Sequence, residues 1–461
     1  MKLNKRWSKL TRLAGTGALS LALLLGYVLP VHGQTPAALP ISPWSVTTLN
    51  EGEKYGIFPL EWYQESSFQQ SIPADKFITL MEGTAKKLDL LGLKKKNASL
   101  SFPTDKVITR EAVITSLYKL MANYELPAAF EMTGDNHPID YMKKKGLVKG
   151  TSAGLELNQP STVEQATVMA SRLVEFAYDT VGGGAEGLMW KVTNGKNTMY
   201  LLGSIHMGIA DMYPMQKDIR EAYEESDELW VEADIINGDT DYMTQKMVYT
   251  DGTTLKDHVS AETYQKVQKL LTKLQLPANS FDAYKPFAVS LSVPTLGYVD
   301  GETDVQFAML SGIDRYFLTK AMLDEKPINE LEGIKLQADL LSGVPAEQQE
   351  KELNIMLDSV MAEKGLEEST KLLKDMQTEW VEGDLNGFTQ IMTTHGDFGE
   401  GEVNQRLLGE RDKNMAIKLA EVLEKKGETT SFVVVGAAHF SMKGMVIDHL
   451  RAKGYDVQQL K

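Results

Sequence analysis

Two histidines follow the same short motif at widely separated points in the chain. One motif is Gly203-Ser204-Ile205-His206 and the other is Gly436-Ala437-Ala438-His439. Each comes directly after an apolar, β-prone run, at residues 198–202 and 430–435, and such runs are typical of buried strands. A glycine three residues before a histidine is a common coincidence. Its repetition after two strand patterns indicates a functional pair.

Glu232 is the carboxylate that we expect beside these histidines. It follows a third β-prone run at residues 228–231, and a helical stretch separates that run from His206. This strand–loop–helix–strand pattern predicts two neighbouring parallel strands. Binding sites of open α/β sheets lie at the carboxyl ends of the strands, so His206, Glu232 and His439 should converge at one edge.

Two imidazoles and one carboxylate are suitable ligands for a divalent metal ion with open positions for water and substrate. Such an ion lowers the pKa of bound water toward ~7 and polarises a carbonyl group, which suits hydrolysis. The helical His-Glu-x-x-His motif and the Gly-x-Ser-x-Gly elbow are both absent. The chain has no cysteine, which excludes a thiol nucleophile.

The remaining histidines lack this placement after a strand. His32, His137, His258 and His449 have no apparent chemical partner, and His395 lies in a predicted loop, where we consider it an accessory candidate.

Composition places the chain among ordinary globular proteins. Of its residues, 43% are hydrophobic and 24% are charged. Its length of 461 residues is enough for two or three domains. The formal net charge of −15 argues against nucleic-acid binding. Without cysteine there are no disulfides, and a metal must be held by histidine and carboxylates, which favours Zn, Mn, Co or Fe.

Residues 1–33 have the pattern of a secretory signal peptide. A basic start precedes an apolar run at residues 18–29, and Val31-His32-Gly33 predicts cleavage before Gln34. We therefore expect a secreted or cell-envelope protein with a net charge of −20, since the segment carries five positive charges. An uncleaved anchor is the alternative, but the run is shorter than the ~20 residues that span a bilayer. No transmembrane segment is expected after cleavage.

The rest of the chain divides into two predicted domains. Residues 34–45 are a linker, residues 46–180 are mainly helical, and the glycine-rich segment 181–187 is a second linker. Residues 188–461 begin with a predicted hairpin whose turn contains Asn194-Gly195, a strong turn signal. A mostly helical middle follows before the last strand.

A repeated pattern in residues 42–179 resembles the S-layer homology repeat. Its last copy contains Pro160-Ser161-Thr162-Val163-Glu164, its middle copy contains Thr109-Arg110-Glu111-Ala112, and a decayed first copy leads to Pro73. In that family, three repeats form a helical domain that binds anionic cell-wall polysaccharide. The resemblance implies wall polysaccharide as a partner. A helical spacer without a ligand is the alternative.

The second domain resembles the TraB/GumN (Tiki-like) family over nearly all of residues 188–461. The resemblance rests on both Gly-x-x-His motifs, Glu232, residues 312–317, Leu331-Glu332, Trp380 with Gly383-Asp384, and Glu410-Arg411. The family is related to animal Tiki proteins, which are metal-dependent proteases. It implies an α/β fold with a mixed sheet and helices.

The resemblance also implies roles for individual residues. His206, Glu232 and His439 would form the metal or catalytic set, with Mn, Co or Zn as the expected ion. Arg411 would be an electrostatic partner near the site, and Asp314 and Glu332 would be accessory residues. The chain has Asp412 where the family usually has Asn, and Phe440–Lys443 replace its usual small residues.

Two functions from different classes follow from these patterns. The first is an exported metal-dependent peptidase, with a peptide or protein substrate, that its N-terminal domain attaches to the wall. The second is a non-enzymatic envelope protein that binds a pheromone-like peptide in the same cleft. Metal dependence distinguishes the two.

Overall fold

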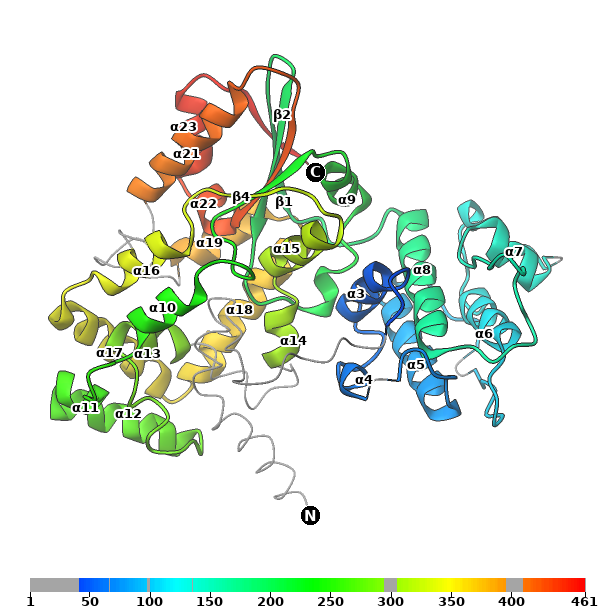
Figure 1. The fold of residues 1–461 in the computed structure, drawn as a ribbon, viewed down its shortest axis with the longest axis horizontal. Coiled ribbons are helices and arrows are strands. Elements are labelled where there is room, and N and C mark those ends of the chain that lie inside the picture. The colour runs from blue at the N-terminus through cyan, green and yellow to red at the C-terminus, as the bar shows by residue number, and fades with distance from the viewer. Residues whose placement is uncertain are drawn as a thin grey trace. The chain divides into compact units, whose positions relative to one another are not determined.

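A computed structural model describes residues 41–460 except 66, 98–99, 135, 294–304 and 395–408 (Figure 1). The predicted signal peptide and His395 lie outside the described residues. The chain forms two compact units. The helical unit contains the described residues up to Ala185 together with Ala210–Arg220. The sheet unit contains Glu186–Ile209 and the chain from Glu221 onward. Whether the two units fold independently stays a prediction.

The helical unit confirms the expected helical N-terminal region. Its longest helix, α8, begins at a capping box in which Thr162 and Gln165 exchange side-chain and backbone hydrogen bonds. Thr109 caps α6 by accepting a hydrogen bond from the backbone N–H of Ala112. Its elements are α3 (Val46–Lys54), α4 (Glu61–Gln64), α5 (Ala74–Asp89), α6 (Arg110–Ala122), η1 (Ala128–Phe130), α7 (Pro138–Lys144), α8 (Val163–Val181) and η2 (Ala210–Met212).

The sheet unit is built on a six-stranded mixed sheet in the order β4-β3-β5-β2-β1-β6. Strands β2, β5, β3 and β4 are parallel, whereas β1 is antiparallel to both β2 and β6. This confirms the α/β fold with a mixed sheet. The strands are β1 (Leu188–Asn194), β2 (Asn197–Ser204), β3 (Glu228–Val231), β4 (Ile328–Glu330), β5 (Thr430–Gly436) and β6 (Val457–Leu460).

The expectation that β2 and β3 are neighbours is wrong, because β5 lies between them and pairs with both. In β5, the five residues from Ser431 to Val435 are all buried, so this strand is covered on both faces. A strand that is apolar on both faces is most stable in the middle of a sheet. Helix spacing along the chain cannot reveal that a strand two hundred residues later inserts there.

Helices cover both faces of the sheet. On one face, Phe432 of β5 packs against Tyr223 of α9 (Lys217–Glu224) and Phe317 of α15 (Ile313–Leu323). On the other, Lys418 of α21 (Glu410–Leu423) lies over the ring of Trp230. The sheet therefore lies in a helix–sheet–helix arrangement, which holds the strand ends in place.

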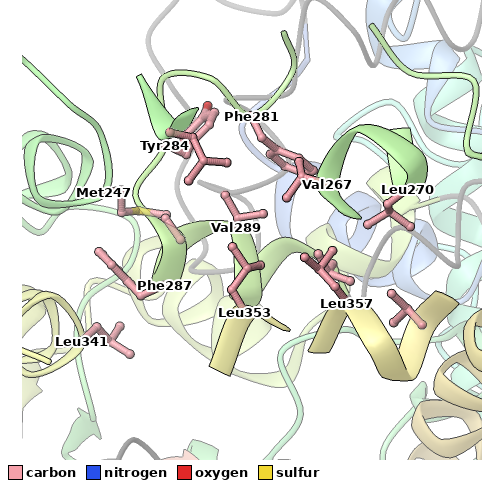
Figure 2. Packing of buried hydrophobic residues seen from close by; sticks show 14 of the residues in the cluster. Met247, Val267, Leu270, Phe281, Tyr284, Phe287, Val289, Leu341, Leu353 and Leu357 are labelled. Atoms are coloured by element: carbon pink, nitrogen blue, oxygen red, sulfur yellow. The ribbon is translucent and has the colours of Figure 1, made fainter. Parts of the chain in front are cut away.

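A second apolar core lies among the helices of the chain's middle region. Figure 2 shows side chains of several of these helices packed together, among them Val289, Leu353 and Leu357, which are fully buried. The helices are α10 (Thr240–Met247), α11 (Leu255–His258), α12 (Ala261–Lys273), α13 (Pro286–Ser292), α16 (Ile334–Ser342) and α17 (Ala346–Met361). The methionines of this region, such as Met243, are core residues.

The sheet unit contains further helices. They are α14 (Val305–Leu310), α18 (Gly365–Val381), α19 (Leu385–Thr394), α22 (Ala437–Ser441) and α23 (Val446–Ala452). Within the described part of the chain, no helix is both long and apolar enough to cross a bilayer.

Ala210–Arg220 is part of the helical unit although it follows His206 by only a few residues. Lys87 Nζ donates to the carbonyl oxygen of Ala210 at 2.6 Å, and Arg220 forms ion pairs with Glu175 and Asp179 of α8. The chain thus leaves the sheet unit after β2 and returns within α9.

Candidate active site

The strand register brings the two Gly-x-x-His motifs to the same edge of the sheet. Ser204 of β2 is paired with Gly436 of β5, so both histidines lie just beyond the carboxyl ends of adjacent strands. Val231 of β3 is paired with Val434 on the other side of β5, which places Glu232 beside Gly436. The convergence that the sequence predicted therefore occurs through β5 as the shared neighbour.

Several donors hold the carboxylate of Glu232 at this edge. Its Oε1 accepts the backbone N–H of Gly436 at 2.6 Å, and its Oε2 accepts from Gln337 Nε2 and Arg411 Nη2, both at 3.2 Å. A Cβ at position 436 would lie 3.2 Å from Oε1, so the motif glycine permits this close approach. His439 Nε2 is 3.8 Å from the same oxygen.

Glu232 is held as the ionised carboxylate. Burial raises the pKa of Glu232, but the charges of His439, Arg411 and His206 together with the Gly436 hydrogen bond outweigh it, and the pKa lies below its usual value. A buried anion is therefore maintained among cationic side chains.

His206 is oriented by a carboxylate from another element. Its Nδ1 lies 2.8 Å from Oδ2 of Asp314, a residue in the first turn of α15, and Ser204 Oγ donates to the other oxygen of Asp314 at 2.6 Å. The negative charge of Asp314 raises the pKa of His206 to about 9. The side chain of His206 is 62% exposed, whereas that of Asp314 is only 12% exposed.

Backbone contacts fix the loop that carries His206. Ile313 N donates to the carbonyl oxygen of Ile205 at 3.0 Å. A Cβ at Gly312 would lie 2.2 Å from the carbonyl oxygen of His206, so only glycine fits there. Trp380 of α18 is fully buried, and its Nε1 donates to the Gly203 carbonyl oxygen at 2.7 Å. The start of α15 and the end of α18 therefore hold the first motif in place.

His439 lies in the short helix α22 and has a matching carboxylate. Its Nδ1 is 2.9 Å from Oδ1 of Asp412, which is fully buried, and the backbone N–H of Gly409 donates to Oδ2 of Asp412 at 2.8 Å. Burial lowers the pKa of His439, but the charges of Glu232 and Asp412 outweigh it, so the pKa lies above the usual value.

Arg411 links Glu232 to Glu332. Its Nε and Nη2 donate to Glu332 at 2.9 and 2.6 Å, while Nη2 also reaches Glu232. The backbone N–H groups of Glu332 and Gly333 both donate to the Glu232 carbonyl oxygen at 2.9 Å. The single positive charge of the guanidinium group is thus shared between two carboxylates that are mostly removed from water.

The side chains at this edge are of the types that bind divalent cations in proteins. In the part of the chain that the structure describes, no group of three or more His, Asp or Glu side chains already lies in a metal-binding geometry. Each histidine nevertheless contacts a carboxylate through Nδ1, which leaves Nε2 as the available nitrogen, as is usual for metal-ligating histidines. His206, His439 and Glu232 are the residues that would hold the ion.

Comparison with known proteins assigns the sheet unit to a family. The model of the TraB/PrgY/gumN family matches residues 188–459, which is more than half of the chain. The chain belongs to the TraB/PrgY/gumN family. This TraB-type region is 26% identical over 262 residues to the uncharacterized protein YbaP of Escherichia coli, which covers 56% of this chain and 89% of YbaP.

The TraB-type region is also similar to animal Tiki proteins. The chain is 25% identical over 214 residues to a metalloprotease TIKI homolog of Nematostella vectensis, covering 42% of this chain and 43% of that protein. It is 21% identical over 302 residues to metalloprotease TIKI2 of Xenopus tropicalis, covering 56% and 57%. The chain therefore spans about half the length of these Tiki proteins. No solved structure matches. The S-layer resemblance of the helical unit stays a prediction.

Several contacts at this edge of the sheet are not predicted from the sequence. In the sequence, Asp412 stands out only as an unusual residue after Arg411, because its contact with His439 depends on how α21 approaches α22. Gln337, which contacts Glu232, and Gln377, which donates to the Met207 carbonyl oxygen at 2.7 Å, have no sequence signal beyond their positions in amphipathic helices. Asp314, Glu332 and Arg411 lie at the site as the resemblance implied.

Proposed function

We propose that the sheet unit is a metal-dependent hydrolase that cleaves peptide bonds. The observation that carries this proposal is the pair of carboxylate-bound histidines beside Glu232 at the carboxyl edge of the parallel strands. Similarity to two proteins whose names describe them as metalloproteases supports the same reaction class. A peptide or protein is the substrate class that this reaction requires.

The residues of the site would divide into ion ligands and a residue that supports them. His206, His439 and Glu232 would hold the ion, with Mn, Co or Zn as candidates for these nitrogen and oxygen donors. The bound ion would supply Lewis acidity toward a carbonyl group and make water more acidic. Arg411 keeps Glu232 ionised and oriented through its 3.2 Å hydrogen bond. The exposed side chain of His206 is the member of the set that solvent and substrate can reach.

Isothermal titration of the purified full chain with Mn, Co and Zn tests the metal site. His206→Ala should abolish binding while leaving the fold intact, because its side chain is 62% exposed. His439→Ala should also abolish binding, but it removes the partner of the buried Asp412, so thermal unfolding must show that this variant is folded. Glu232→Gln should be as damaging, since an amide cannot supply the negative charge. His258→Ala and His449→Ala are matched controls that should bind like the unaltered chain. Unchanged affinity in the His206 and His439 variants would refute the site.

Hydrolysis is tested separately on the metal-loaded chain. Mass spectrometry of a mixture of unstructured peptides should show cleavage that a chelator stops and that the His206→Ala variant lacks. Binding of peptides without cleavage, and with no dependence on metal, would instead establish the non-enzymatic peptide-binding function.

We also propose that the protein is exported and acts at the cell envelope. The signal-peptide pattern of residues 1–33 supports this, and the helical unit is the candidate for attachment to wall polysaccharide. N-terminal sequencing of the protein from the native cell envelope should give a start near Gln34. An intact Met1 would contradict export with cleavage. Co-sedimentation of the full chain with purified cell walls tests attachment, and its absence would leave the helical unit as a spacer.

A further inference from the structure

Two carboxylates outside the expected metal set have the same arrangement. Asp314 places one oxygen 2.8 Å from Nδ1 of His206, and Asp412 places one oxygen 2.9 Å from Nδ1 of His439. In both cases the carboxylate comes from the first turn of a helix, α15 or α21, and not from the strand that carries the histidine.

Each carboxylate is itself fixed through its second oxygen, but by a different donor. Ser204 Oγ donates to Asp314, whereas the backbone N–H of Gly409 donates to Asp412. Ala437 occupies the place in the second motif that Ser204 has in the first, so that motif has no hydroxyl group to offer. The two motifs therefore reach the same arrangement by separate means, which a chance contact would not produce.

Stability alone does not account for the first pair. The His206 side chain is mostly exposed, and exposed ion pairs stabilise a fold little because water screens them. Ser204 and Asp314 are nonetheless only 4% and 9% exposed. Ser204 donates to Asp314, and Asp314 contacts the imidazole of His206. What the contact does determine is the ring's orientation and which nitrogen keeps its proton.

We propose that Asp314 and Asp412 are positioning residues that keep the Nδ1 proton on His206 and His439, so that both rings present Nε2 toward Glu232. His439 already shows this orientation, since its Nε2 is the nitrogen 3.8 Å from Glu232. The inference rests on the proposed function for the identity of what Nε2 binds. Ser204 acts one step further away, because it fixes Asp314.

Zinc binding to the full chain gives the first test. Asp314→Ala should weaken zinc affinity about 10–100-fold, the usual cost of losing such a partner. Ser204→Ala should weaken it less, because Asp314 remains. Glu330→Gln is the matched control: Glu330 lies at the end of β4 and accepts the Asp234 N–H at 2.7 Å, so this variant removes a nearby charge without touching an imidazole. Equal affinities for Asp314→Ala and Glu330→Gln would overturn the proposal.

Nitrogen NMR of the histidine rings gives a readout that a merely structural role would not change. In the zinc-loaded chain, His206 and His439 should coordinate through Nε2 and keep a hydrogen-bonded Nδ1 proton. In Asp314→Ala, the Nδ1 proton of His206 should lose its protection from exchange while that of His439 keeps it. Coordination through Nδ1 in the unaltered chain would refute the inference.

The metal-free chain separates this inference from the proposed function. If no ion binds, the proposed function fails, but a protected Nδ1 proton on both histidines would still support the positioning role. Its absence from both rings would overturn that role. This measurement also tests Asp412 without substitution, which is necessary because Asp412 is part of the cap of α21 and its removal would weaken that helix.

Discussion

Replacing Arg411 by methionine should destabilise the sheet unit strongly. The Arg411 residue is 8% exposed, and its guanidinium group donates to Glu332, whose side chain is 3% exposed, and to Glu232, whose side chain is 14% exposed. Removing the cation leaves two largely desolvated carboxylates without their partner. Breaking a buried pair in this way costs about 3–5 kcal/mol of the free energy of unfolding.

A double variant identifies the cause. Glu332→Gln in the Arg411→Met background removes one of the uncompensated charges, so the combined loss should be smaller than the sum of the two single losses by about 1–3 kcal/mol. Urea unfolding followed by tryptophan fluorescence is a suitable assay, because Trp190, Trp230 and Trp380 are all buried in this unit.

A matched control lies two residues further along the same helix. Lys413 forms an ion pair with Glu410 in which the side chains are 55% and 85% exposed, and Lys413→Met should change the free energy of unfolding by less than about 0.5 kcal/mol. A loss below about 1 kcal/mol for Arg411→Met, or strict additivity in the double variant, would refute the assignment of Arg411 as the buried counter-charge.

Three further predictions concern other parts of the molecule. Burial lowers the pKa of Lys87 to about 8, below its ordinary value of 10.5, so the folded chain binds fewer protons than the unfolded chain at intermediate pH, and stability should rise with pH in that interval. The free energy of unfolding of the unaltered chain minus that of Lys87→Met, both from thermal unfolding, should therefore increase by about 2 kcal/mol between about pH 8 and 10. A difference that does not change with pH would contradict the lowered pKa. Gly312→Ala puts a Cβ against the His206 carbonyl oxygen, so it should lower the free energy of unfolding by about 1–3 kcal/mol and weaken zinc binding. In Gly134→Ala the new Cβ meets nothing within 4 Å, so thermal unfolding and zinc titration should give the values of the unaltered chain. Trp380→Phe removes the indole N–H that donates to the buried Gly203 carbonyl oxygen and should cost about 2–4 kcal/mol in urea unfolding. A loss below about 1 kcal/mol would show that the loop before His206 does not depend on this indole.

The sequence predicted the strand ends well because their signals are local. The run 430–435 is apolar throughout and is followed by a glycine, and it forms β5 with nearly the predicted limits. The hairpin around Asn194-Gly195 also forms as its turn residues predict. In both cases the pattern of burial is encoded within a few neighbouring residues.

The arrangement of the strands and the partners of the histidines depend on long-range packing. β5 inserts between β2 and β3 because it can bury both faces, and this choice involves residues two hundred positions apart. Asp412 reaches His439 only because α21 lies beside the end of β5. Periodicity reveals which side of a helix is apolar, but it does not reveal which strand end a polar residue at its first turn will meet.

The return of Ala210–Arg220 to the helical unit has a consequence for biosynthesis. Domains of a growing chain generally fold from the N-terminus as they leave the ribosome. Here Met212, Tyr213, Met215 and Ile219 are buried residues of that late segment. The helical unit therefore cannot make its contacts with this segment, such as those of Lys87 with Ala210 and of Arg220 with Glu175, until the β1–β2 hairpin and the first motif histidine have also emerged. Nascent chains that pause before this point would lack these contacts, and the helical unit would then be exposed in an incomplete form.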